Sequence, residues 1–305
     1  MNSYNLITIL GPTASGKTTL ATRLAKEINS EIISADSRQV YRGMDIGTGK
    51  DLQDYEVEGE AIPYHLIDIV DAGTKYNVYE YQNDFKKVFI ELREQGIVPV
   101  LCGGSGLYLE AVLEGYKLIQ VPKNEDLRKE LEQFTLPELT RKLAGLKPLH
   151  NSTDTDTKRR AIRAIEIALY YKEHPEINLD FPAIHSLNIG VKVDRESRRR
   201  KITQRLKQRL KEGMLEEVEA LINEGIDPQN LIYYGLEYKY VTLYLIGEIE
   251  YKEMFEKLNT AIHQFSKRQM TWFRRMERKG IEIHWLEADD PLDDNVQKVV
   301  SLLKV

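Results

Sequence analysis

A short glycine-rich segment near the start of the chain places the tightest constraint on its fold. Residues 11–18 read GPTASGKT, which has the G-x-x-x-x-G-K-T spacing of a P-loop. The apolar run at 5–10 before it predicts a buried strand. After it, Leu20, Leu24 and Ile28 repeat at helical spacing. A strand that enters the loop and a helix that leaves it are the context in which this spacing indicates phosphate binding.

Strands and helices alternate along the first hundred residues. Further strands are predicted at 31–35, 65–70 and 97–102, and a helix is predicted at 79–95. This alternation predicts an α/β fold: a P-loop NTPase-like parallel sheet with helices on both faces. In such sheets ligands bind beyond the carboxyl ends of the strands.

A region of different character interrupts this core. Residues 123–174 read as helices, with leucines at helical intervals and few strand signals. Beyond it the sequence predicts a core strand, three helices and a last strand, at 186–193, 195–212, 214–224, 250–278 and 281–286. We therefore expect a catalytic core of residues 1–114 and 186–305, with basic C-terminal helices, and a helical insertion domain at 115–185.

The composition is that of an ordinary globular protein, with 42% hydrophobic residues and a net charge of -5. Because the whole chain has no basic excess, binding to nucleic acid would need a local basic patch. The single cysteine, Cys102, lies in an apolar run and offers neither a disulfide nor a zinc set. No apolar stretch is long enough to span a membrane. We expect a cytoplasmic monomer.

The P-loop specifies a phosphate ligand without naming it. Its glycines let successive N–H groups point at an anion, and the following helix N-terminus adds partial positive charge. Lys17 supplies a full charge, and the Thr18 hydroxyl can bind Mg²⁺. Both ATP and a prenyl diphosphate carry the diphosphate that such a loop recognises. A kinase would transfer the phosphoryl group, whereas a prenyltransferase would let the diphosphate leave.

Polar residues follow several of the predicted strands. Asp36 could hold Mg²⁺ or accept a proton from a nucleophile, and Asp68 competes for the metal role. His65 is expected to orient its neighbours. The glycine turn at 103–108 would let a substrate approach the backbone, although a tight strand-to-helix turn explains it equally well.

Three basic segments stand out in this acidic chain. Nine of the seventeen residues in 195–211 are Arg or Lys, and apolar residues recur every fourth position there, so one stripe can pack while the basic faces stay exposed. Further clusters lie at 158–163 and 267–279. These basic clusters suit RNA phosphates, although a basic run on a helix is also commonly only a solvated face. Trp272 and Phe273 could stack on bases, but such spacing is more typical of a core.

Together these segments resemble the tRNA dimethylallyltransferase (isopentenyltransferase) family. The matching blocks occur in the family's order and cover most of the chain: GPTASGKT at 11–18, ADSRQVYRGMDIGTGK at 35–50, YHLIDIV at 64–70, GGSGLY at 103–108, KRRAIRAIEI at 158–167, GLEYK at 235–239 and SKRQMTWFRR at 266–275. The second and last of these blocks are far more specific than the P-loop.

The resemblance implies a reaction and its substrates. A dimethylallyl group would pass from dimethylallyl diphosphate to N6 of the adenine just 3′ of the anticodon in certain tRNAs, and Mg²⁺ would be the cofactor. Asp36 would be the general base, Thr18 would help to place Mg²⁺, and Arg205 would reach the diphosphate. The diphosphate site implied by the resemblance comprises Gly11, Pro12, Thr13, Ala14, Ser15, Gly16, Lys17 and Thr18.

The family resemblance also implies contacts with tRNA. They would be made by Asp36, Ser37, Arg38, Gln39, Ser105, Arg159, Arg160, Ala161, Ile162 and Arg163. The last five of these residues would make the insertion domain a tRNA-contacting domain. Four features depart from the usual family pattern. Ser105 replaces a threonine, and GLEYK replaces a G-Y-[KR] form. Residues 146–153 lack the usual lead-in to the basic helix, and Arg209 stands where a methionine is common.

Three other functions share parts of this pattern. An ATP-dependent small-molecule kinase would keep the P-loop and Asp36 but would have no need of the basic helices. A nucleotide switch that binds RNA is disfavoured as a GTPase, because the Asn-Lys-x-Asp guanine motif is absent. Prenyl transfer to free adenine nucleotides would use the same core without a polymer-binding surface.

Overall fold

The computed structural model describes residues 4–149, 153–175 and 180–304. The chain forms two compact units. The larger unit contains Met1–Tyr116 and Pro182–Val305, and the smaller unit contains Lys117–Phe181. These limits lie close to the boundaries expected from the sequence at 114/115 and 185/186.

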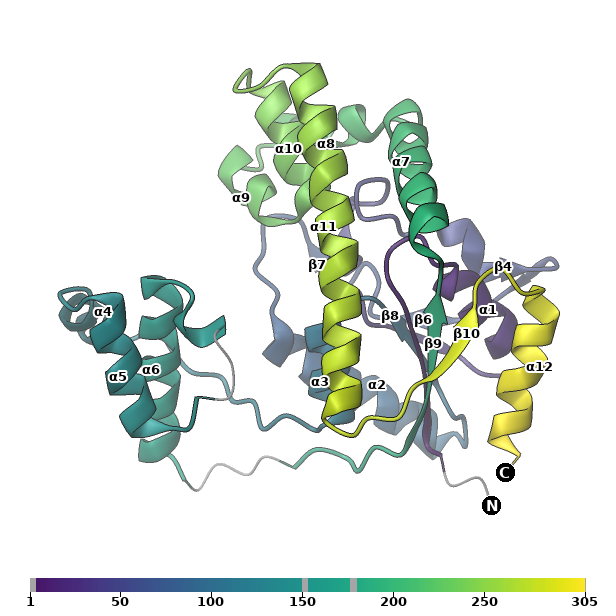
Figure 1. The fold of residues 1–305 in the computed structure, drawn as a ribbon, viewed down its shortest axis with the longest axis horizontal. Coiled ribbons are helices and arrows are strands. Elements are labelled where there is room, and N and C mark those ends of the chain that lie inside the picture. Colours follow the sequence, from purple (N-terminus) through teal and green to yellow (C-terminus); the bar gives the residue numbers. More distant parts are fainter. Residues whose placement is uncertain (1–3, 150–152, 176–179, 305) are drawn as a thin grey trace. The chain divides into compact units, whose positions relative to one another are not determined.

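A six-stranded parallel sheet forms the centre of the larger unit (Figure 1). Its strand order is β10-β9-β1-β8-β2-β6. The strands are β1 (Leu6–Leu10), β2 (Ile32–Ser34), β6 (Tyr64–His65), β8 (Val100–Gly103), β9 (Ser186–Lys192) and β10 (His284–Glu287). All five residues of β1 are buried, as expected for a central strand covered on both faces. The predicted α/β fold is confirmed.

Helices cover the sheet and extend beyond it. On one side, α1 (Lys17–Glu27) packs against α12 (Leu292–Leu303), a helix that the sequence did not predict. Elsewhere α2 (Val78–Glu94) contacts α3 (Gly106–Leu113). The long α11 (Tyr251–Arg278) contacts α3, α7 and α10 and so connects the sheet layer with the C-terminal helices (Figure 1).

The C-terminal helices of the larger unit pack against one another. They are α7 (Arg195–Lys211), α8 (Met214–Asn223), α9 (Pro228–Tyr233) and α10 (Leu236–Leu245). Contacts join α7 to α8, and α10 to both α8 and α9. Within the part of the chain that the structure describes, none of the helices has the length and apolar character that crossing a bilayer requires.

The predicted strand at 65–70 is wrong beyond His65. Leu66 and Asp68 adopt left-handed backbone conformations, with φ of 63° and 55°, so the chain turns out of the sheet. The residues that follow form β7 (Val70–Asp71), which pairs with β3 (Tyr41–Arg42) instead of with the main sheet. A short 3₁₀ turn and a hairpin complete this region: η1 (Leu52–Tyr55), β4 (Glu56–Val57) and β5 (Glu60–Ala61).

The smaller unit is helical and has its own core. It contains α4 (Glu125–Leu131), α5 (Leu136–Leu146), η2 (Thr153–Thr155) and α6 (Lys158–Glu173). Leu139, Leu143 and Ile165 are among its buried residues. Glu166 lies in this interior; burial would raise its pKa, but hydrogen bonds from Arg128, Asn124 N–H and Arg163 outweigh burial and lower it to about 2.

A buried cation organises the loop after β3. Lys50 is 1% exposed, and its Nζ donates to the Tyr41 carbonyl at 2.7 Å, to Asp45 at 2.5 Å and to Asp68. The Glu217 carboxylate accepts the N–H groups of Asp45, Ile46 and Gly47 in the same loop. Every donor of the ammonium has a partner, which is the condition under which a cation can be buried.

Replacing Lys50 with methionine should therefore destabilise the larger unit by about 3 kcal/mol, because a paired buried charge is removed and its acceptors lose their donor. Urea denaturation would measure the loss. The matched control is Lys87→Met: the Lys87 side chain is 76% exposed and pairs with Asp84, so its loss should cost less than about 0.5 kcal/mol. Equal effects of the two substitutions would contradict the assigned role of Lys50.

Candidate active site

A cavity of about 540 Å³ opens at the carboxyl edge of the sheet, within the larger unit. Its volume is in the range of small-molecule sites. Five cationic side chains line it, against two carboxylates: Lys17, Arg38, Arg205, Arg209 and Arg268 against Asp36 and Glu237. The balance of charge therefore favours an anionic ligand.

The P-loop forms one wall of this cavity. Ala14 and Gly16 adopt left-handed backbone conformations, with φ of 61° and 80°, which curl the loop before α1 begins at Lys17. Thr13, Lys17 and Thr18 line the cavity. The cavity lining does not include the other five predicted loop residues: Gly11, Pro12, Ala14, Ser15 and Gly16. Burial lowers the pKa of Lys17, an effect that nearby Asp36 partly offsets, so an anion in the cavity would find a poorly solvated ammonium.

Asp36 lies just beyond the end of β2 and lines the same cavity. Its Oδ1 accepts the Arg38 N–H at 2.9 Å, which fixes the carboxylate in a local turn. Its Oδ2 accepts no hydrogen bond within the described part of the chain. One carboxylate oxygen is thus committed to the fold, and the other is available to a ligand.

The glycine turn after β8 holds this segment in place. The Ser105 Oγ accepts the Ser37 N–H at 3.0 Å, and the Ser105 N–H donates to the Ala35 carbonyl at 3.3 Å. At Gly103 any Cβ would overlap the Ala35 carbonyl, so only glycine allows this approach. The hydroxyl of Ser105, which stands where the family commonly has threonine, therefore has a structural partner.

The remaining predicted residues of this segment also line the cavity. The Gln39 Oε1 accepts from the Ser34 hydroxyl at 3.1 Å, and its Nε2 donates to the Gly49 carbonyl at 3.1 Å, so both ends of the amide are engaged. Arg38 lies over the Tyr233 ring at 5.8 Å.

Asp68 does not belong to this site. Its carboxylate accepts from Lys50, and it is not among the residues that line the cavity. The expectation that it competes for a metal is therefore wrong, and the reason is the left-handed turn that carries it away from the sheet edge. His65 does orient a neighbour, since its Nε2 lies 2.6 Å from Glu31 Oε2.

Arg205 lines the cavity from α7, and Arg209, one turn later on the same helix, lines it as well. Asp51 Oδ2 accepts from Arg205 and, at 3.4 Å, from Arg209. The sequence did not predict Arg209 as a site residue. It stood out only because the family commonly has methionine at this position.

The α11 helix closes another side of the cavity. Gln269 is 7% exposed; its Oε1 accepts the Thr13 N–H at 2.9 Å, and its Nε2 donates to the Gly104 carbonyl at 2.9 Å. Gln269 thus ties the P-loop to the glycine turn. No local pattern in the sequence predicts this role for Gln269, because neither partner is near it along the chain.

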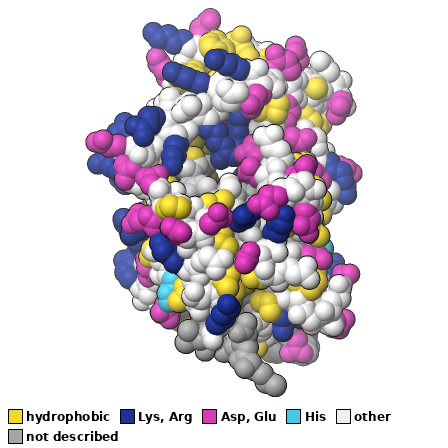
Figure 2. Space-filling model, turned by 90° about the vertical axis from the view of Figure 1, so that its right-hand side faces the viewer, with side chains coloured by type: hydrophobic (Ala, Val, Ile, Leu, Met, Phe, Trp, Pro, Cys, Tyr) yellow, Lys and Arg dark blue, Asp and Glu magenta, His cyan; other side chains and the backbone are white. Residues whose placement is uncertain are grey.

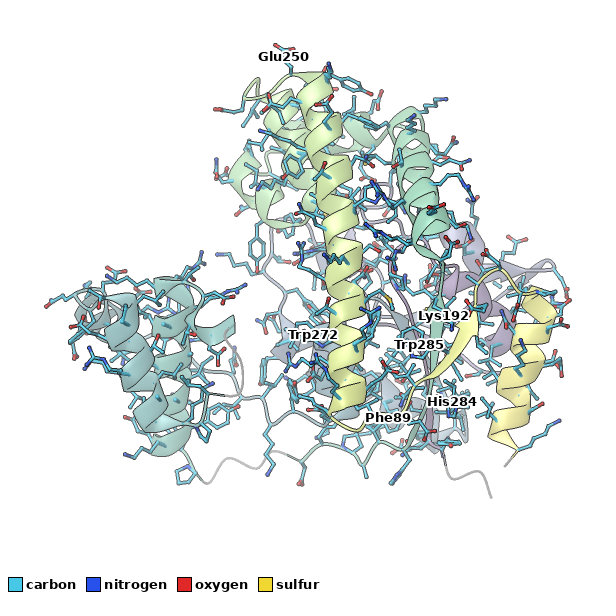
Figure 3. All side chains as sticks on the ribbon, viewed as in Figure 1. Phe89, Lys192, Glu250, Trp272, His284 and Trp285 are labelled. Atoms are coloured by element: carbon cyan, nitrogen blue, oxygen red, sulfur yellow. The ribbon has the colours of Figure 1, made fainter. Side chains whose placement is uncertain are left out.

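Of the two aromatic residues considered for base stacking, only one reaches the cavity. Trp272 lines it and packs on Gly106, and its Nε1 is buried without a partner in the described chain. Phe273 is fully buried and lies 6.4 Å, between ring centroids, from Trp285. Figure 3 labels Trp272 on α11 and Trp285 on β10.

Cys102 is buried beside the P-loop, and its Sγ donates to the Lys17 carbonyl at 3.8 Å. Burial raises the pKa of its thiol to about 11, so it stays protonated near neutral pH. It behaves as the buried small residue that the sequence predicted.

The predicted RNA-binding segment of α6 divides by exposure. Ala161 and Ile162 lie in the core of the smaller unit, and Arg163 donates to Glu166 and to the Val121 carbonyl. Arg159 and Arg160 are exposed. Within this segment these two arginines are therefore the exposed basic side chains, and Arg160 also pairs with Asp156 at 3.1 Å.

Basic side chains also gather on α7. Arg195, Arg199, Arg200 and Lys207 are exposed, and Figure 2 shows Lys and Arg over the upper part of the face that includes this helix, with acidic side chains among them. In the cluster at 267–279, Arg275 and Lys279 pair with the buried carboxylate of Glu110, whereas Lys267, Arg268, Arg274 and Arg278 are exposed. Exposed basic side chains thus lie on α7 and on the C-terminal half of α11.

Comparison with known proteins identifies the family. The sequence pattern of a family described as IPP transferase matches residues 39–276. The chain belongs to the IPP transferase family. Membership makes it an enzyme, a prenyltransferase, as the sequence predicted.

Relatives of this IPP transferase match it over its whole length. A protein named tRNA dimethylallyltransferase 2 from Bacteroides fragilis is 62% identical over 304 residues, covering 100% of this chain and 99% of the relative. A protein of the same name from Phocaeicola vulgatus is 60% identical over 303 residues, covering 99% of each chain.

Solved structures resemble it as well. The tRNA isopentenylpyrophosphate transferase of Bacillus halodurans has a TM-score of 0.72 and 32% identity, covering 98% of this chain and 95% of the other. A eukaryotic dimethylallyltransferase acting on tRNA shares the fold, with a TM-score of 0.77 at 22% identity, covering 98% of this chain and 78% of the other.

The position of Gln269 generates a prediction about anion binding. In Gln269→Leu the Thr13 N–H and the Gly104 carbonyl lose their buried partners, which should loosen the P-loop and lower the affinity for inorganic pyrophosphate about tenfold. Isothermal titration calorimetry would measure the affinity. Gln297→Leu is the control, because Gln297 is exposed on α12. Unchanged affinity in the Gln269 variant would contradict its role as a tie.

Proposed function

We propose that this IPP transferase transfers a dimethylallyl group from dimethylallyl diphosphate to N6 of the adenine 3′-adjacent to the anticodon in tRNA. The products are N6-isopentenyladenosine and diphosphate. The observation that carries the proposal is that one cavity is lined at once by Lys17, Asp36 and Arg205. The names of the full-length relatives support the same reaction.

The diphosphate end of the substrate is assigned to the P-loop. Lys17 and the start of α1 supply positive charge, and Arg205 lines the same cavity. When the C1–O bond of dimethylallyl diphosphate breaks, its electron pair goes to the diphosphate. Charge that develops on this leaving group would be stabilised by groups already oriented toward it.

The acceptor end is assigned to Asp36. The exocyclic amine of adenine is a poor nucleophile, because its lone pair is delocalised into the ring. As the N6–C1 bond forms, N6 must lose a proton, and the unoccupied Oδ2 of Asp36 would accept it. Reaching this cavity requires that the adenine leave its stack in the tRNA.

An oxygen donor beside the P-loop also fits Mg²⁺. Thr18 offers a hydroxyl, and Mg²⁺ commonly takes only one or two protein ligands when substrate phosphates supply others. No group of three or more acidic, histidine or cysteine side chains forms a metal site among the described residues. When bound, Mg²⁺ would neutralise charge on the diphosphate oxygens.

The mass of the reacted tRNA tests the reaction as a whole. Unmodified tRNA incubated with dimethylallyl diphosphate should gain one C5H8 group on a single adenosine, with release of diphosphate. Release of phosphate from ATP with unchanged tRNA would favour a kinase or ATPase instead. Modification of free adenine nucleotides in preference to tRNA would contradict the assigned acceptor.

Asp36→Asn should lower the rate of transfer by about 10²–10⁴-fold, because the amide cannot accept the proton from N6. Binding of tRNA, measured by filter retention, should stay within about twofold. Glu237→Gln is the matched control: Glu237 is the other carboxylate of the cavity, its pKa is raised by burial, and its loss should leave most of the rate. The reverse pattern would assign the base to Glu237.

The exposed surface of α7 generates a separate prediction. Replacing Arg199 and Arg200 together with glutamine should weaken tRNA binding and reduce its salt dependence, with a slope smaller by about 1–2 in a plot of log K against log salt. The control replaces two exposed lysines elsewhere, Lys252 and Lys304, with the same loss of charge. A slope unchanged in the first variant, or reduced equally in both, would rule out α7 as the RNA surface.

A further inference from the structure

We propose that Arg209 is a second diphosphate-binding residue beside Arg205, and that Asp51 positions both guanidinium groups. The proposal rests on the proposed function and adds a residue to the site that holds the leaving group. It concerns a position at which the family commonly has methionine, so it assigns this chain an anion contact that the shared motifs do not supply.

The first support is geometric. Arg205 and Arg209 are four residues apart on α7, so their side chains leave the same face of the helix. Both line the cavity that the P-loop lysine also lines. Asp51 Oδ2 accepts from both guanidinium groups, which fixes them as a pair.

The second support is burial. Arg209 is 9% exposed, which is rare for an arginine. The chain makes room for it at Gly49, whose φ is +68° and where any Cβ would overlap the guanidinium group. The fold therefore brings this charge up to the cavity wall and leaves little water around it.

The third support is charge balance. A buried guanidinium needs a compensating anion. Among the described residues, Asp51 is the carboxylate that hydrogen-bonds to this pair, and it is shared between two cations. Asp36 and Glu237 add negative charge nearby, but the cavity lining still carries five cationic side chains against these two carboxylates. The cavity is therefore short of negative charge until a polyanion enters it. A diphosphate supplies several negative oxygens, and planar guanidinium groups bind such oxygens in pairs.

Arg209→Met tests the proposal on the full chain. Methionine keeps the stem and most of the volume, and it is the side chain common at this position in the family, so the fold should persist by circular dichroism. The affinity for inorganic pyrophosphate should fall about 10- to 30-fold, and KM for dimethylallyl diphosphate should rise similarly, with KM for tRNA unchanged. Arg209→Lys, which keeps one charge, should recover part of both losses.

Two outcomes would overturn the proposal. If the Arg209→Met variant binds pyrophosphate as tightly as the wild type but has a raised KM for tRNA, Arg209 is an RNA contact. If the variant keeps the wild-type pyrophosphate affinity and KM values and loses only stability, Arg209 is only a structural partner of Asp51. The pyrophosphate titration is independent of the reaction: a wild-type enzyme that binds pyrophosphate but modifies no tRNA would refute the proposed function, while the Arg209 comparison would still be decided.

Discussion

The pairing of β8 between β1 and β2 is the constraint on which the rest of the site depends. In this parallel register Leu10 lies opposite Gly103, and Ser34 lies opposite Cys102. The three loops that follow these strands therefore leave the sheet at one edge. The P-loop, Asp36 and the glycine turn meet there because of backbone hydrogen bonding, before any side chain contributes.

Side chains from distant segments then fix these loops against one another. Gln269 joins the P-loop to the glycine turn, Ser105 holds the backbone after Asp36, and Gln39 reaches across to Gly49. The buried ammonium of Lys50 orders the loop to which Gly49 belongs. Hydrogen bonds thus position the loops that carry Lys17 and Asp36, and groups positioned in advance can stabilise a developing anion without reorganisation.

The sequence predicted the parts of this structure that local patterns determine. The P-loop follows from its spacing, β1 and α1 follow from the periodicity of apolar residues, and Asp36 follows from its position after a strand. The prediction of a strand beyond His65 is wrong, because left-handed residues and the ion pair between Asp68 and Lys50 override the apolar pattern there. The tie made by Gln269 had no local signal, since it joins residues 256 positions apart.

A structure of the enzyme with unmodified tRNA and a dimethylallyl diphosphate analogue whose bridging oxygen is sulfur would test the central claim most directly. We predict that the diphosphate will lie in the loop formed by residues 11–18, with the Asp36 carboxylate within hydrogen-bonding distance of N6 of a flipped adenine. A diphosphate bound outside that loop, or an Asp36 that contacts only the metal ion while another group faces N6, would contradict it.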